Sequence, residues 1–122
     1  MADQFIAETL VKLDVWCKGL ANDHALRQYA IRRVEFQLSR FGTDVACVED
    51  RLSDDNGAKG GVDKRCRLTL KGDRFSPLSI EEVSDNIFAS VDLSVQRSAR
   101  TIARILDRSR EFRPYVIARR AQ

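Results

Sequence analysis

The sequence has few of the residues that build metal sites and disulfide frameworks. It contains three cysteines and one histidine. The cysteines, Cys17, Cys47 and Cys66, lie far apart, are odd in number and form no CxxC pair, so neither a disulfide scaffold nor a zinc site is expected. We predict three buried thiols, a reducing compartment, and no bound metal or cofactor.

Long apolar runs are also lacking. A membrane-spanning helix needs about 18 consecutive apolar residues, and no such run occurs. The first residues contain acids ahead of any apolar run and no basic stretch, unlike a secretory signal. We therefore predict a cytoplasmic protein with no membrane partner.

Catalytic motifs are scarce. His24 has no serine or cysteine beside it in a nucleophile motif, and the loop "NGAKGG" lacks the Gly-Lys-Ser/Thr of a phosphate-binding loop. Glu81 and Glu82 are adjacent in a predicted strand, so their side chains face opposite ways and cannot cooperate as an acid–base pair. We predict that the protein is not an enzyme and has no small-molecule substrate.

The composition is that of one globular domain. The chain has 122 residues, of which 43% are hydrophobic and 32% charged, enough to bury a core without a disulfide or a metal. The net charge of +3 is only mildly basic. The distribution of the 21 lysines and arginines therefore matters more than their sum.

The hydrophobic pattern predicts six elements. Val11, Leu13, Val15 and Cys17 alternate with polar residues, as in a half-buried strand. The predicted elements are a strand at 10–18, a helix at 22–42 capped by Asn22 or Asp23 and by Gly42, strands at 43–52, 65–71 and 78–83, and a helix that begins after Ser84 or Asp85. Pro114 should end this second helix by about residue 112.

The order of elements predicts a single α+β domain, β-α-β-β-β-α, in residues 1–122. Both helices pack on one face of a four-stranded sheet, which buries the apolar stripe of each helix, an arrangement similar to the double-stranded-RNA-binding architecture. We predict a core at about 10–112 and a C-terminal tail at 113–122.

The second helix carries arginines at helical spacing. Arg97, Arg100, Arg104 and Arg108 fall within a stripe about 80° wide. The apolar residues point nearly the other way; they are Ile87, Phe88, Val91, Val95, Ile102 and Leu106. No acidic residue of this helix lies within the stripe. We predict that these arginines bind phosphates of RNA, the alternative being a merely solvated face.

Further basic residues extend the predicted interface. The first helix contributes Arg27, Arg33 and Arg40, and its basic flank would merge with the stripe if the two helices are neighbours. Weaker candidates are Lys59, Lys64, Arg65 and Arg67. The open sheet face would display Lys12, Arg65, Arg67 and Trp16, which either stacks on a base or simply covers the sheet.

Two stretches resemble the ribosome hibernation promoting factors, also called ribosome-associated inhibitors or ribosomal subunit interface proteins, in their short form. "HALRQYAIRRV" at 24–34 is similar to the opening of the family's first helix, and "NIFASVDLSVQRSARTIAR" at 86–104 to its second. The likeness spans about residues 11–108. The chain departs from the family at Asn22 and Asp23 and in its long loop at 53–64. We expect no C-terminal domain of the kind with which long members of the family pair ribosomes.

The resemblance implies a function in translation. Such proteins bind the small ribosomal subunit in the channel used by messenger and transfer RNA, and so silence idle ribosomes under stress. It implies that basic residues at Arg27, Arg33, Arg97, Arg100 and Arg104 contact ribosomal RNA. Two alternatives stay open from the residues alone: a protein-interaction module whose basic helix binds an acidic partner, and a general binder of structured RNA.

Overall fold

The computed structural model describes residues 3–5, 12–20, 23–55 and 63–121, with side chains over 12–20, 24–55 and 63–109. In chain order the elements are β1 (Asp3–Phe5), β2 (Lys12–Lys18), α1 (Asp23–Leu38), a 3-10 helix η1 (Ser39–Asp44), β3 (Cys47–Asp54), β4 (Lys64–Gly72), β5 (Phe75–Ser84) and α2 (Ile87–Ala121). The predicted order is confirmed. The short strand β1 was not predicted.

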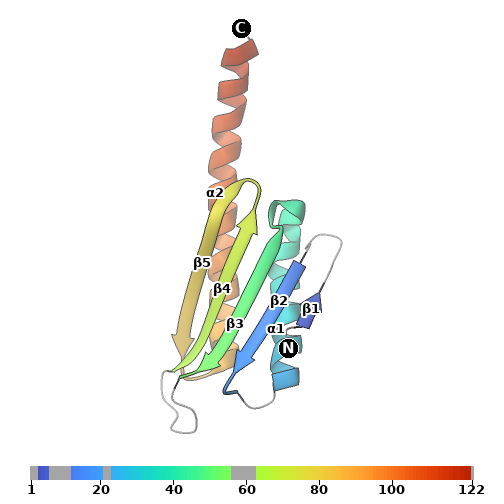
Figure 1. Ribbon diagram of the computed structural model, residues 1–122. Helices are drawn as coiled ribbons and strands as arrows, with labels where there is room; N and C mark the ends of the chain where they lie inside the picture. The colour runs from blue at the N-terminus through green and yellow to red at the C-terminus, as the bar shows by residue number, and fades with distance from the viewer. Residues whose placement is uncertain (1–2, 6–11, 21–22, 56–62, 122) are drawn as a thin grey trace.

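One sheet runs in the order β1-β2-β3-β4-β5 (Figure 1). Strands β2 and β3 are parallel, and all other neighbours are antiparallel. Parallel neighbours require a crossover, which α1 provides between β2 and β3. The other neighbouring strands are consecutive in the chain and antiparallel, and α1 and α2 are the two α-helices of the described chain.

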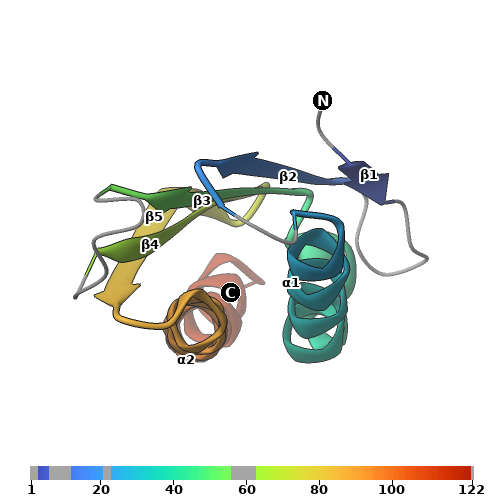
Figure 2. The same cartoon turned by 90° about the horizontal axis from the view of Figure 1, so that it is seen from below.

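Both helices cover the same face of the sheet, as predicted (Figure 2). Helix α1 packs on β2, α2 packs on β4 and β5, and the two helices contact each other. Most residues of the predicted apolar stripes form the core: Leu26, Ala30, Val34 and Leu38 of α1 and Val91, Val95, Ile102 and Leu106 of α2 are buried against Leu13, Val15, Val48, Leu52, Leu68 and Leu70 of the strands. Phe88, which the pattern placed on the buried side of α2, is 39% exposed. No helix of the described chain covers the opposite face of the sheet, which we call the open face (Figure 2).

The N-terminal half of α2 is fixed to the sheet by small polar residues. Ser90, Ser94 and Ser98 are buried, and the hydroxyl of Ser90 donates to the carbonyl of Lys64 at 2.6 Å. The helix begins after Asn86, whose side-chain oxygen accepts the N–H of Phe88 at 2.9 Å. Asn86 is therefore the N-cap, not Ser84 or Asp85 as predicted.

The helix ends also differ from the predictions. Helix α2 continues through Pro114 to Ala121, so the predicted end of the helix at about residue 112 is wrong. A proline removes one backbone hydrogen bond from a helix interior, and here the helical turns on both sides persist. Helix α1 ends earlier, at Leu38, and the chain tightens into η1, where Gly42 has a φ of 58°.

The three cysteines are free thiols. Cys66 is buried as predicted, whereas Cys17 and Cys47 are only half-buried. Cys47 lies at the first position of β3, on the uncovered face, where no helix shields it.

Candidate nucleic-acid interface

The predicted arginine stripe of α2 faces away from the core. Arg97, Arg100, Arg104 and Arg108 are all exposed. Val91, Val95, Ile102 and Leu106, on the other side of the helix, are at most 2% exposed. The helix therefore buries one face against β4 and β5 and presents guanidinium groups on the other.

One member of the stripe has a carboxylate partner. Arg97 Nη1 lies 2.6 Å from Glu82 Oε2 of β5. The helical periodicity gave no sign of this pair, because the acid comes from a strand and not from α2. For Arg100, Arg104 and Arg108, the described residues offer no hydrogen bond or ion pair to the guanidinium group.

Arg27 lies on the buried side of α1. Arg27 is only 8% exposed, and its Nη1 donates a hydrogen bond to the carbonyl oxygen of Val15 at 2.8 Å. The spacing of seven residues between Arg27 and Val34 places both on one helix face, which is the signal that the stripe analysis overlooked. Arg27 ties α1 to β2, so we leave it out of the interface.

Arg33 lies between the two helices. Its Nε is 3.0 Å from Oδ1 of Asp92 on α2, and the hydroxyl of Tyr29 donates to the same oxygen at 2.6 Å. This hydrogen bond, with burial, raises the pKa of Tyr29 above its usual value. The Tyr29 ring also meets the Phe88 ring edge-on, with centroids 5.0 Å apart. Arg33 thus contributes to helix pairing.

Arg40 is brought beside the arginine-bearing part of α2. It is exposed in η1, with its guanidinium carbon 4.7 Å from the centroid of the Phe41 ring. A groove of about 280 Å³ separates the two elements; its lining residues are Arg40, Phe41, Ala103, Leu106 and Asp107. The two helices are neighbours, which was the condition for their basic residues to form one surface. Arg40, just after α1, is the arginine that lines the groove between them.

The weaker candidates differ in availability. Lys64 is held by Asp63 at 2.6 Å and by Asp54 at 3.3 Å, and these contacts, with Asp63 the stronger, raise the pKa of the lysine. Arg65 contacts Asp55 at 2.6 Å and Glu81 at 2.7 Å. Arg67 is exposed on the open sheet face. Lys59 lies outside the described residues.

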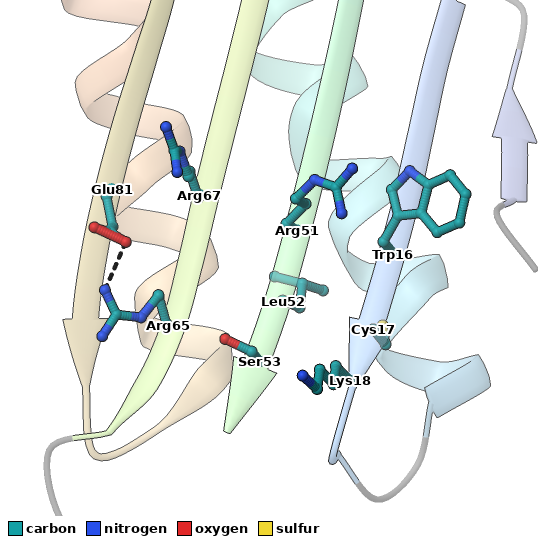
Figure 3. Close-up of a pocket in the computed structure, with 9 residues that line it drawn as sticks. All are labelled: Trp16, Cys17, Lys18, Arg51, Leu52, Ser53, Arg65, Arg67 and Glu81. Carbon is teal, nitrogen blue, oxygen red and sulfur yellow. Dashed lines mark hydrogen bonds and ion pairs between the residues drawn. The ribbon is translucent and has the colours of Figure 1, made fainter. Parts of the chain in front are cut away.

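The open sheet face carries a second cluster of cations around Trp16. Strand alternation places Trp16, Arg51 and Arg67 side by side on β2, β3 and β4 (Figure 3). The Arg51 guanidinium carbon is 5.5 Å from the Trp16 ring centroid. The sequence analysis placed Trp16 and Arg67 on this face but overlooked Arg51, because its strand was recognised from composition and not from alternation.

Metal binding and membrane insertion gain no support. No group of three or more His, Cys, Asp or Glu side chains that could hold a metal is found within residues 12–20, 24–55 and 63–109. In the part of the chain that the structure describes, no helix has the length and apolar character of a membrane span.

Comparison with known proteins finds similarity in structure. Neither a protein-family model nor a curated protein sequence matches the chain. A ribosomal subunit interface protein from Coxiella burnetii superposes with a TM-score of 0.61 and 16% identity, over 75% of this chain and 93% of that one. The N-terminal domain of Thermus thermophilus Protein Y superposes with a TM-score of 0.59 and 19% identity, over 74% and 92%. This chain therefore has the fold of a ribosomal subunit interface protein.

Proposed function

We propose that this protein binds the ribosome and suppresses translation by occupying the channel for messenger and transfer RNA on the small subunit. The observation that carries the proposal is the row of exposed arginines at 100, 104 and 108 on α2, which have no carboxylate partner among the described residues. Each arginine that meets a phosphate releases a condensed counterion, so a row of them favours a polyanion.

The fold supports the ribosome as the source of that polyanion. Two solved structures with this fold are a ribosomal subunit interface protein and a domain of Protein Y. The interface we propose consists of Arg100, Arg104 and Arg108 with Arg40 across the groove, and Arg97 after release from Glu82. Arg33 supports it by holding α1 against α2 through Asp92. Inhibition follows from occupancy and needs no catalytic group.

The double substitution Arg100→Glu with Arg104→Glu tests this proposal. We expect co-sedimentation with ribosomes to be lost and the melting temperature to stay nearly unchanged, because both side chains are exposed. The matched control, Lys12→Glu with Lys71→Glu, makes the same change in net charge at two exposed positions of the open sheet face. It should keep co-sedimenting. Binding retained by the α2 variant would overturn the proposal.

Two further measurements separate the alternatives. After nuclease treatment, capture of a purified acidic protein in place of ribosomes would favour the protein-interaction module. Equal affinity for ribosomes and for any RNA duplex of similar length would favour a general binder of structured RNA. Our proposal expects binding that is lost with the RNA and that is tighter for the small subunit than for a duplex.

A further inference from the structure

The open face of the sheet is a surface that the α2 interface does not use. It contains a groove of about 610 Å³, within the range of about 300–1,000 Å³ typical of small-ligand sites. The groove lies over the ends of β2, β3, β4 and β5 (Figure 3). Helices α1 and α2 both lie on the opposite side (Figure 2).

An aromatic ring is presented at one side of this groove. Trp16 is 40% exposed, although it is one of the residues that proteins usually bury. In Figure 3, seen from the open face, the indole lies with its plane turned toward the viewer. A ring face open to solvent on a sheet is a platform on which a planar base can stack.

Cationic side chains line the rest of the groove. The groove is lined by Lys18, Arg51, Arg65 and Arg67 against a single carboxylate, Glu81. Arg65 holds Glu81 at 2.7 Å and Asp55 at 2.6 Å, and Arg51 holds Glu49 at 2.8 Å. Lys18 and Arg67 are exposed and have no ion pair among the described residues.

The strand register places Trp16, Lys18 and Arg67 close enough together for one short polyanion to contact all three. Lys18 lies two residues beyond Trp16 on β2, about 7 Å along the strand, and Arg67 lies two strands across, roughly 10 Å away. An anion on either cation would therefore leave a neighbouring base within reach of the indole.

We propose that this groove binds a short segment of single-stranded RNA, with one base stacked on Trp16 and the flanking phosphates on Lys18 and Arg67. The ring distinguishes this ligand from an acidic peptide, which would use the cations and leave the indole uncovered. The site goes beyond the proposed function, because it lies on the other side of the sheet from the arginines of α2. It gives the protein a second RNA contact.

The chain offers a direct reporter for this site. Trp16 is its only tryptophan, so intrinsic fluorescence reports on the groove alone. A short oligoadenylate should quench this fluorescence in a saturable way. An abasic ribose-phosphate strand of equal length and a polyglutamate peptide should not. Absence of quenching by oligoadenylate, or equal quenching by all three, would overturn the proposal.

Variants test the residues one by one. Arg67→Ala or Lys18→Ala should weaken the apparent affinity for oligoadenylate about three- to tenfold, since each removes one phosphate contact. Binding of a labelled oligoadenylate, followed by anisotropy, should weaken at least about fivefold in Trp16→Leu and much less in Trp16→Phe. Equal affinity of both Trp16 variants would overturn stacking.

The Arg100→Glu, Arg104→Glu variant separates this site from the α2 interface. We expect it to give the same quenching curve as the unmodified protein while losing ribosome co-sedimentation. Quenching that disappears with the α2 arginines would contradict an independent site. Conversely, absent quenching with intact co-sedimentation would remove the groove proposal and leave the proposed function standing.

Discussion

The thiol of Cys66 donates a hydrogen bond to Oδ1 of Asp50 across 3.1 Å in the centre of the core. The hydroxyl of Ser94 on α2 donates in turn to the sulfur at 3.0 Å. Asp50 is fully buried, and its Oδ2 has no hydrogen-bond partner among the described residues. Burial raises the pKa of Asp50 to about 7, although the thiol contact lowers it slightly.

We expect the stability of the protein to fall as the pH rises between about 4 and 7. The folded pKa of Asp50, about 7, lies above its ordinary value of 3.8, so folding takes up a proton in this window. The favourable contribution is complete below the unfolded pKa and is lost as the pH passes the folded pKa. At 1.36 kcal/mol per unit, the loss approaches about 4 kcal/mol. Urea unfolding at a series of pH values measures it.

The variant Asp50→Asn isolates this effect. An asparagine keeps an oxygen to accept the Cys66 hydrogen bond but does not titrate, so the variant should lose the pH dependence of this window and be the more stable protein above pH 7. Glu49→Gln, at the adjacent, partly exposed position, is the matched control and should leave the dependence unchanged. Parallel stability curves for the unmodified protein and Asp50→Asn would contradict the buried titration.

Cys66 should resist thiol reagents in the folded protein. Burial, followed by the nearby Asp50 carboxylate, raises its pKa far above the ordinary range, and the thiolate is the reactive form. Cys17 and Cys47 are half-buried and should react faster. Alkylation at neutral pH followed by peptide mass spectrometry measures each site. Modification of Cys66 as fast as the other two, before unfolding, would contradict the structure.

The sequence predicted the fold well because its apolar periodicities are regular. Leu26, Ala30, Val34 and Leu38 recur along one face of α1, and Cys66, Leu68 and Leu70 alternate along β4; all are buried. The same alternation correctly separated Glu81 from Glu82: one contacts Arg65 on the open face and the other Arg97 on the helix side. The errors concerned the two ends of α2, at Asn86 and Pro114, because the apolar pattern does not determine where a helix begins or ends.

The interface was harder to predict because charge availability depends on partners distant in sequence. Arg33 and Arg97 are exposed by periodicity, yet Asp92 and Glu82 meet them from other elements. Arg27 is basic, yet its guanidinium group is buried and donates a hydrogen bond to the carbonyl oxygen of Val15. A helical wheel shows only neighbours within one helix, so it cannot predict contacts between a helix arginine and a group on another element.

Asp92 should stabilise the packing of α1 on α2. Its Oδ1 accepts one hydrogen bond from the Tyr29 hydroxyl at 2.6 Å and lies 3.0 Å from Arg33 Nε. Because these groups are partly exposed, we expect Asp92→Asn to lower the unfolding free energy by only about 1–2 kcal/mol. Its removal should also lower the pKa of Tyr29 toward 10.0, which spectrophotometric titration follows. An unchanged tyrosine titration and stability would contradict this bridge.

Glu82 and Glu81 provide a matched pair for the α2 interface, since they are adjacent in β5 and face opposite sides of the sheet. Glu82→Gln removes the carboxylate that holds Arg97 at 2.6 Å and frees the guanidinium for phosphate. A partly exposed pair of this kind is worth up to about 1 kcal/mol, so ribosome affinity should rise about two- to fivefold. Glu81→Gln makes the same change in charge beside Arg65 on the open face. Arg65 lies outside the α2 interface and keeps its contact with Asp55 at 2.6 Å, so ribosome affinity should change much less than in Glu82→Gln in co-sedimentation at moderate salt. An equal rise in both variants would mean that net charge, and not the geometry of Arg97, determines binding, because the two substitutions differ only in the face on which the carboxylate lies.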